Sequence, residues 1–295
     1  KPMLFTIGVS AFAWTSAEYW RVNKYYIRKE YRQYVRELYA SWGLEDPYPP
    51  PFRGRTQPLN PSSFSLSQVP ILGSLTPAQK LMAPIIAICC GVFAMWQFPV
   101  FGLRFMYKNF AHFPESGIAR TLLTSAFSHA TPLHLAFNML ALWSFSEAAY
   151  PLLGPEYYLA TVASGAVVAS MAQHAYGLML GSNPALGASG FVFSIVTYVA
   201  LSYPNNQALL FFVIPAPLLG LLQGLVVFDF IGLTGIWTKM FNLRLAHAAH
   251  LGGVALGAAV WWLNQMDNRR RLAKSMPEEA VGLYNKSYDA LIKRY

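Results

Sequence analysis

A serine and a histidine in two separate apolar stretches are the residues of this chain best suited to do chemistry together. Ser189 lies in a Gly-Ala-Ser-Gly sequence, and His250 lies in the octet Ala-His-Ala-Ala-His-Leu-Gly-Gly. Both stretches are long enough to cross a bilayer, where polar side chains are costly and mark function. A serine hydroxyl becomes a nucleophile when a base lies within hydrogen-bond reach. The pair predicts peptide-bond hydrolysis within a membrane, with Ser189 as nucleophile and His250 as base.

The base is expected to act without a carboxylate. No acidic residue accompanies His250 in its apolar stretch, and Asp229, the acid of the preceding stretch, is assigned by our counting to the wrong end for contact. We therefore predict a Ser-His dyad. His247 is the alternative base, since it lies one turn before His250 on nearly the same helix face.

Acyl transfer also forms an oxyanion that needs hydrogen-bond donors. The backbone N–H of Ser189 at a helix start, the His134 ring and the Asn138 amide are the candidates. His134 and Asn138 are four residues apart and share a helix face. Taken alone, these two residues are explained equally well by hydrogen bonds between helices.

Glycines accompany both members of the pair. Gly187 and Gly190 flank the serine, and Gly253 and Gly257 follow His250 at positions i+3 and i+7. Small residues let two membrane helices approach backbone to backbone. We predict that these glycines bring the serine and histidine helices into contact.

The composition is that of an integral membrane protein. Hydrophobic residues make up 55% of the 295 residues and charged residues 12%, against about 25% charged in soluble domains. The net charge is +9, but the basic residues lie outside the apolar stretches, so we expect anionic lipids and not nucleic acid as partners.

Adjacent Cys89 and Cys90 are interpreted as packing residues. Because the chain begins at Lys1 and not at Met, we expect that a targeting segment has been removed.

Seven apolar stretches are candidate membrane spans, since a span needs roughly 20 residues. The weakest is the sixth, because Pro215 and Pro217 interrupt its first turns and its helix could begin only at Pro217. The seven spans are Pro2 to Trp20, Leu81 to Leu103, Pro132 to Tyr150, Tyr157 to Leu178, Gly187 to Tyr203, Leu209 to Leu233 and Ala246 to Leu263.

The connection between the first two spans has a different character. Arg21 to Trp42 has apolar residues at helical spacing and predicts a helix on the membrane surface. Pro47 to Pro70 is rich in proline and reads as an extended linker. Thr76 followed by Pro77 predicts the start of the next helix.

Charge and the order of the spans place the polar residues at one depth. The segment Arg21 to Lys80 and the tail after Asn264 hold 16 of the 22 Lys and Arg residues, which favours six spans between them. The spans that begin at Pro132, Gly187 and Ala246 then all start from the opposite face. His134, Asn138, Ser189 and His250 are therefore expected to lie near one leaflet. Glu147 and Asp229 are intramembrane acids that pair with polar groups or line a water pocket.

Together these motifs resemble those of the rhomboid intramembrane serine proteases. The matching residues are Gly187-Ala188-Ser189-Gly190, His134-x-x-x-Asn138, and Ala249-His250 with Gly253 and Gly257. The resemblance implies an all-α polytopic membrane protein with a six-helix core, here preceded by one extra N-terminal transmembrane helix. The expected parts are residues 1–20 as that helix, 21–79 as a basic and Pro-rich loop, 80–264 as the catalytic core and 265–295 as a basic tail.

The extra span before the core, Lys1 to Thr6 and Ala246 to Gly253 are similar to the mitochondrial subclass, the presenilin-associated rhomboid-like proteases. This resemblance implies the inner mitochondrial membrane and cleavage of single-span membrane proteins after import, with roles in quality control and cell death. It implies no cofactor and no metal. It also implies a matrix N-terminus, which puts the basic segments in the intermembrane space, against the usual positive-inside rule.

The chain departs from the family pattern at two places. Ala119-Arg120 stands where many rhomboids have Trp-Arg in the first long loop. Phe193 stands where bacterial relatives have a tyrosine, so it can stack on the histidine but cannot donate a hydrogen bond. A substrate helix is expected to enter beside the span from Leu209, whose two prolines make its start pliable.

Two other classes are alternatives. A catalytically silent, client-binding relative would be expected to lack the serine or the histidine, and both are present. A transporter would be expected to show inverted repeats with broken helices in both halves. The His-Glu-x-x-His sequence of a metalloprotease is absent, and the oligomeric state stays open.

Overall fold

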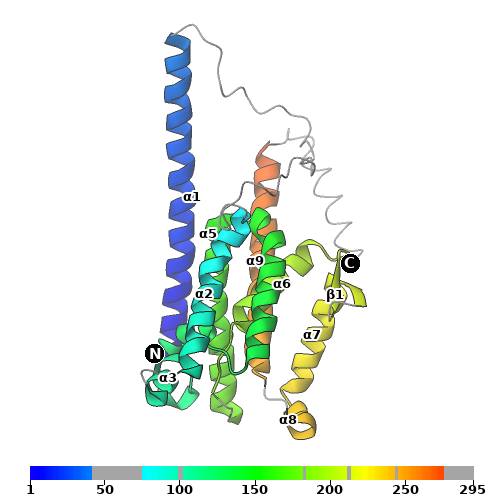
Figure 1. Cartoon of the computed structure of the whole chain (residues 1–295). Helices are drawn as coiled ribbons and strands as arrows, with labels where there is room; N and C mark the ends of the chain where they lie inside the picture. Colours follow the sequence, from blue (N-terminus) through cyan, green and yellow to red (C-terminus); the bar gives the residue numbers. More distant parts are fainter. Residues whose placement is uncertain (42–74, 99–101, 182–183, 211–213, 243–244, 276–295) are drawn as a thin grey trace, which may run out of the picture.

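The computed structural model describes residues 1–41, 75–98, 102–181, 184–210, 214–242 and 245–275, and this part of the chain is mostly helical (Figure 1). The predicted linker Pro47 to Pro70 and the tail beyond Ser275 lie outside the described residues. The longer helices are α1 (Pro2–Ser41), α2 (Pro77–Gln97), α3 (Leu103–Phe110), α5 (Pro132–Leu180), α6 (Ser189–Ser202), α7 (Leu218–Gly232) and α9 (His247–Ser275). Short helices are α4 (Thr121–Thr124), α8 (Ile236–Phe241) and two 3₁₀ turns, Pro114–Ser116 and Ser125–Phe127.

Helix α1 is longer than the predicted first span. It runs without interruption to Ser41, so the predicted surface helix after Trp20 is a continuation of α1 and not a separate element. The physical reason is that no glycine or proline stands between Trp20 and Ser41 to break the helix. Its lower part packs along α5, where Trp14 Nε1 donates to Ser164 Oγ at 3.1 Å and Lys24 Nζ lies 3.1 Å from Glu156 Oε1.

Helix α2 begins as predicted. Thr76 accepts a hydrogen bond from the Gln79 backbone N–H and the Gln79 side chain accepts from the Thr76 N–H, which forms a capping box before Pro77. The Thr76 hydroxyl also donates to Glu147 Oε1 at 2.7 Å, so this predicted intramembrane acid does pair with a polar group. Among the described helices, α2 is the one that is long and apolar enough to cross a membrane by length and mean hydropathy; α6 and α7 are apolar but shorter.

Helix α5 contains the two predicted spans before the serine. Gly154 has a non-helical backbone with φ 71° and lies between Pro151 and Pro155, so it divides the segment into two helices. Ser146 and Tyr158 are twelve residues apart and are hydrogen bonded to each other. A straight helix would separate them by about 18 Å, so the chain reverses at Gly154.

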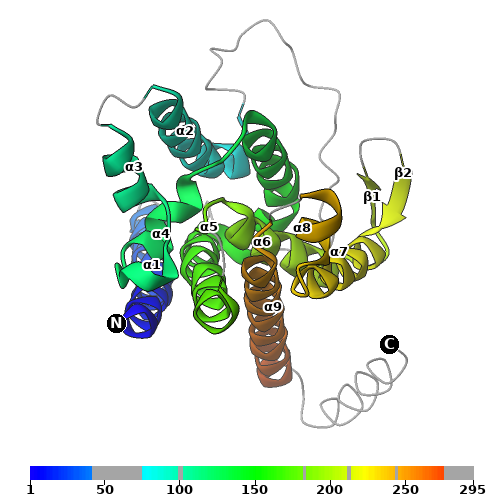
Figure 2. The ribbon, with the colours of Figure 1, turned by 90° about the horizontal axis from the view of Figure 1, so that it is seen from below.

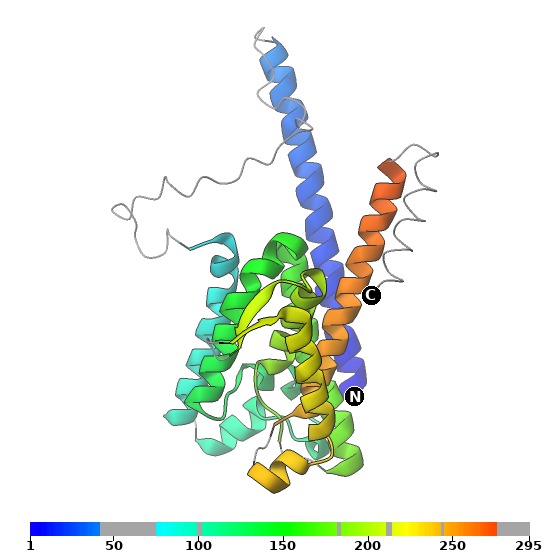
Figure 3. The same cartoon turned by 90° about the vertical axis from the view of Figure 1, so that its right-hand side faces the viewer.

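The sixth span is helical only from Leu218, directly after the start at Pro217 that the two prolines allowed, and the part of the predicted span before it is not a helix. Residues Gln207–Leu210 (β1) and Ile214–Pro217 (β2) form an antiparallel hairpin, and α7 starts only at Leu218. Pro215 and Pro217 lack the N–H groups that a continuous helix would need here. Figure 3 shows the hairpin at the end of α7 away from α8. Helix α7 therefore descends from the hairpin toward the end of the molecule where α9 begins.

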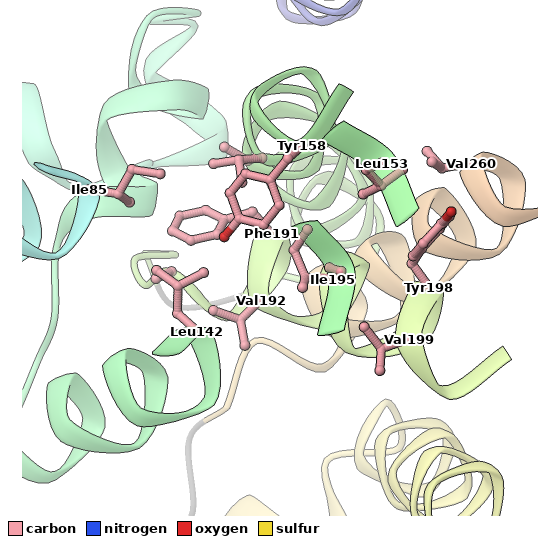
Figure 4. Packing of buried hydrophobic residues seen from close by; sticks show 14 of the residues in the cluster. Ile85, Leu142, Leu153, Tyr158, Phe191, Val192, Ile195, Tyr198, Val199 and Val260 are labelled. Atoms are coloured by element: carbon pink, nitrogen blue, oxygen red, sulfur yellow. The ribbon is translucent and has the colours of Figure 1, made fainter. Parts of the chain in front are cut away.

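Helix α6 is the centre of the fold. Seen from the end at which it starts, α6 lies between α5 and α9 (Figure 2). Its buried side chains Phe191 and Ile195 lie beside Leu142 and Tyr158 of α5, and Tyr198 lies on the side of Val260 of α9 (Figure 4). Many outward side chains are large, apolar and exposed, including Phe137, Trp143, Phe230 and Trp262. A buried centre inside an apolar exterior fits a protein that lies in lipid.

Candidate functional site

Ser189 is the first residue of α6, at the end of a tightly held loop. Gly187 has φ 132°, a conformation that L side chains rarely adopt. Its N–H donates to Ser125 O at 3.0 Å, and two hydrogen bonds pair the backbones of His112 and Ala185 just before it. The loop thus turns sharply into the helix and leaves the Ser189 backbone N–H among the first helix donors, which have no intrahelical partner.

His250 lies within hydrogen-bond distance of this serine. Its Nε2 is 3.0 Å from Ser189 Oγ, although the two residues are 61 positions apart in the sequence. The imidazole is buried, and Phe193 stacks on it with ring centroids 4.4 Å apart and planes 7° apart. Phe193 therefore occupies the stacking position expected from the resemblance and limits the rotation of the His250 ring.

Glycines allow α6 and α9 to come this close. A Cβ on Gly253 would lie 2.2 Å from Gly190 O, and a Cβ on Gly257 would lie 2.3 Å from Ser194 O. A Cβ on Gly190 would meet Ala169 Cβ of α5 at 2.3 Å. These distances are below any real Cβ contact, so the backbones of three helices touch at positions where only glycine fits.

The predicted oxyanion residues lie on the first turns of α5. A Cβ on Gly187 would lie 2.8 Å from His134 Cε1 and 3.8 Å from Ser189 Oγ, so His134 borders the space in front of the serine. Asn138 is buried and its side-chain N–H donates to His134 O at 2.9 Å, within its own helix. His134 is thus beside the serine, while Asn138 stands one turn further along.

His129, which the sequence suggested to be structural or near the mouth of the site, lies beside the residue before Ser189. Its Nε2 accepts from the Ala188 N–H at 3.4 Å, and its ring meets that of His134 edge to face at 5.1 Å. Burial and the neighbouring His134 lower the pKa of His129 to about 4, so the ring is neutral at pH 7 and can accept this bond. His129 thereby holds the peptide just before Ser189.

Asp229 corrects the prediction that no carboxylate reaches the base. It is 1% exposed, and its Oδ1 lies 2.9 Å from His250 Nδ1 and 2.6 Å from His247 Nδ1. Because α7 runs toward the end at which α9 starts, the last turn of α7 lies beside the first turn of α9. The prediction assigned Asp229 to the wrong end of its span. The missed signal was that Asp229 stands four residues before the end of that span, on the face where the span from Ala246 begins.

His247, the alternative base considered from the sequence, does not contact Ser189 in this arrangement. Its Nδ1 faces Asp229, while the His250 ring alone bridges between Asp229 and Ser189. The ligand atoms of Asp229, His247 and His250 lie within 4.8 Å of one another and are the described group that could hold a metal ion. A metal on His250 Nδ1 would leave the proton on Nε2, which conflicts with a base facing the serine.

A narrow crevice reaches the serine from the side of α5. It is lined by Ser125, Ser170, Gly187, Gly190 and Ala246, among others, and has a volume of about 10 Å³. This is close to the space that one water molecule occupies. The site therefore brings together a serine hydroxyl, an imidazole within hydrogen-bond distance and room for one water molecule.

The chain is similar in sequence to a known protein family and to several known proteins. Residues 117–266, about half of the chain, match the family profile of the rhomboid domain. The chain is 28% identical over 270 residues to "Presenilin-associated rhomboid-like protein, mitochondrial" of Bos taurus, which covers 89% of this chain and 66% of that protein. It is 34% identical over 193 residues to "Presenilin-associated rhomboid-like protein A, mitochondrial" of Danio rerio, and the match covers 64% of this chain and 48% of that protein. It is 29% identical over 192 residues to "Rhomboid protein 1, mitochondrial" of Saccharomyces cerevisiae, and the match covers 63% of this chain and 54% of that protein. The chain spans just under two thirds of the length of the bovine protein.

Proposed function

Because the chain belongs to the rhomboid family, we propose that it is an intramembrane serine endopeptidase with Ser189 as nucleophile and His250 as general base. The observation that carries the proposal is the 3.0 Å separation of Ser189 Oγ and His250 Nε2. Nucleophile and base within hydrogen-bond reach are the signature of an activated serine. Contact between α6 and α9 through glycines makes this separation possible.

The setting of this chemistry is a mitochondrial membrane. The chain is of the presenilin-associated rhomboid-like type, and relatives from animals, a plant and yeast are all named mitochondrial. The inner membrane is consistent with these findings. We propose the arrangement of one N-terminal span followed by six core spans, with the site near the leaflet on the side of the N-terminus, where α6 and α9 begin (Figure 1).

The proposed reaction begins with proton transfer from Ser189 Oγ to His250 Nε2. As the proton leaves, Oγ attacks the substrate carbonyl carbon, and the carbonyl electron pair moves to its oxygen. The imidazolium then protonates the leaving amine, so the peptide bond breaks and an acyl-serine remains. Water then attacks the carbonyl carbon of this ester while His250 Nε2 takes one of its protons. The bond from the carbonyl carbon to Ser189 Oγ breaks, the imidazolium returns the proton to Oγ, and the new carboxyl end of the substrate leaves. The crevice beside Gly187 and Gly190 is a route for that water.

The proposed oxyanion donors surround the same point. The Ser189 N–H stands at the start of α6, where the helix dipole favours negative charge. The His134 ring borders the space in front of the serine. We propose that Asn138 contributes its second amide N–H, since the first donates to His134 O. Each lost donor of this type costs about 10²–10³ in turnover.

We propose that the substrates are single-span membrane proteins that are processed as part of mitochondrial quality control. The substrate helix would approach beside α7, which touches the rest of the bundle less extensively than α6 does. The sequence suggested a pliable helix start as the hinge for that approach. In the structure a hairpin stands at this place, and we propose the hairpin as the hinge. The names of several relatives describe them as presenilin-associated, and that association belongs to those proteins.

The test combines a chemical probe with a cleavage assay. Purified protein in detergent is treated with a fluorophosphonate serine probe, and the same samples are incubated with a reconstituted single-span substrate. We expect labelling and cleavage in the wild type, and neither in Ser189→Ala or His250→Ala. His174→Ala is the matched control for loss of a buried imidazole, because His174 bonds His112 and not a residue of the proposed site. This variant is expected to keep Ser189 labelling.

Two results would contradict the proposal. Cleavage that persists in Ser189→Ala would place the nucleophile elsewhere. A folded wild type that neither reacts with the probe nor cleaves would favour a rhomboid-like protein that binds membrane clients without hydrolysing them.

A further inference from the structure

A buried carboxylate links two histidines at the edge of the proposed site. Asp229 Oδ1 lies 2.6 Å from His247 Nδ1 and 2.9 Å from His250 Nδ1. Asp229 comes from α7, and both histidines come from the first turn of α9. A buried carboxylate without donors is very costly, so this position needs an explanation beyond packing.

The protonation states follow from the geometry. A carboxylate oxygen only accepts hydrogen bonds. Both Nδ1 atoms that face Asp229 Oδ1 must therefore carry hydrogen. In a neutral imidazole one nitrogen carries the proton and the other accepts, so His250 Nε2 has its lone pair free and directed at Ser189 Oγ. This is the tautomer that a general base needs.

His247 fixes the carboxylate in turn. Its ring packs so tightly against the end of α7 that a Cβ on Gly232 would lie 2.3 Å from it, and Phe228 meets it edge to face at 5.7 Å. The same turn of α7 is tied down by Trp237 Nε1, which donates to Phe228 O at 2.9 Å, and by Tyr176, whose hydroxyl donates to Leu233 O at 2.6 Å. Asp229 is held from both sides.

We propose that Asp229 is a positioning residue that completes a Ser189-His250-Asp229 arrangement, and that His247 holds Asp229 in place. This inference rests on the proposed protease function. When His250 Nε2 takes the Ser189 proton, the imidazolium gains a second N–H, and the Asp229 carboxylate stabilises its positive charge without itself taking a proton. The titratable groups around the ring are Asp229 on one side and the half-buried His134 and buried His247 rings on the others.

The test uses Asp229→Asn with Glu147→Gln as the matched control, because both changes replace a carboxylate by an amide and only one lies beside His250. Glu147 instead bonds Thr76 at the start of α2. The side-chain amide introduced by Asp229→Asn can donate to His250 Nδ1, which moves the ring proton to Nε2 and blocks the base. We expect kcat to fall by as much as about 10⁴-fold, with KM within about threefold of the wild type. Glu147→Gln is expected to keep kcat.

A measurement on the wild type does not depend on any variant folding. Nitrogen-15 NMR of histidine-labelled protein, with the His250 signal assigned from its absence in His250→Gln, reports which ring nitrogen carries the proton. We expect the Nδ1–H tautomer near pH 8. An Nε2–H tautomer would overturn the proposal.

Kinetic outcomes separate the two levels of the argument. If Ser189→Ala is inactive while a folded Asp229→Asn keeps the wild-type kcat, Asp229 has no positioning role and the protease proposal stands. If KM rises and kcat does not change, Asp229 shapes the substrate path and the inference is wrong. If the wild type fails to react with the serine probe, the proposed function itself fails.

Discussion

Gly253→Ala is the most direct perturbation of the contact that brings serine and histidine together. Ordinary contact starts at 3.4 Å, and the new Cβ would lie 2.2 Å from Gly190 O, so α6 and α9 must separate by 1.2 Å at this point. Gly190 adjoins Ser189, and Gly253 stands one turn after His250. The 3.0 Å bond between Ser189 Oγ and His250 Nε2 would open to about 4 Å, which is too long for a hydrogen bond.

The expected result is a large loss of activity with a moderate loss of stability. A misplacement of about 1 Å in an active site costs about 10²-fold in rate, while overpacking of a close contact costs about 1–3 kcal/mol. We expect fluorophosphonate labelling of Ser189 to slow by about 10²-fold in a protein that still unfolds cooperatively in detergent. Labelling rate and thermal unfolding are measured on the same preparation.

Gly224→Ala is the matched control. It adds the same methyl group to α7, where nothing lies within 4 Å, and alanine is the better helix former. This variant is expected to keep both rate and stability. If Gly253→Ala labels as fast as the wild type, or if Gly224→Ala loses as much as Gly253→Ala does, the backbone contact does not set the Ser-His distance and our reasoning is refuted.

Two further predictions concern the frame around the site. Burial and the neighbouring His174 lower the pKa of His112 to about 4 from its ordinary 6.5, so its stabilising contribution is complete above pH 6.5 and is lost as the pH falls toward 4. The midpoint temperature of thermal unfolding should therefore decrease when the pH is lowered from 7 to 4.5. The decrease should be smaller in His112→Asn, which should already be less stable at pH 7, and an equal decrease in both proteins would exclude His112 as a cause. Trp14→Phe removes the bond to Ser164 Oγ and should lower the free energy of unfolding by about 0.5–1.5 kcal/mol without changing Ser189 labelling. Thermal unfolding in detergent measures the loss, and Trp262→Phe, which changes an exposed tryptophan, is the control. Equal effects of the two changes would argue against docking of α1 through this bond.

Much of the fold could be predicted from local sequence patterns. Apolar stretches located the helices, and Thr76 and Pro77 marked the start of α2. The gap between the predicted spans Pro132 to Tyr150 and Tyr157 to Leu178 contains the break in α5 at Gly154. The hairpin before α7 escaped prediction because hydrophobicity alone does not distinguish a strand from a buried helix in a short apolar run. The continuation of α1 past Trp20 escaped prediction because a change from apolar to charged residues alters the surroundings of a helix without ending it.

The residue types of the candidate site were determined by the sequence itself: a serine between glycines, a histidine followed by glycines at i+3 and i+7, and a His-x-x-x-Asn pair. Only the tertiary structure decided that Asp229 faces both His247 and His250 and that His129 holds the peptide before Ser189. The physical reason is that hydrogen bonds depend on tenths of an ångström. Span counting fixes the depth of a residue only to about a helical turn, or roughly 5 Å, and it does not determine which way a side chain faces.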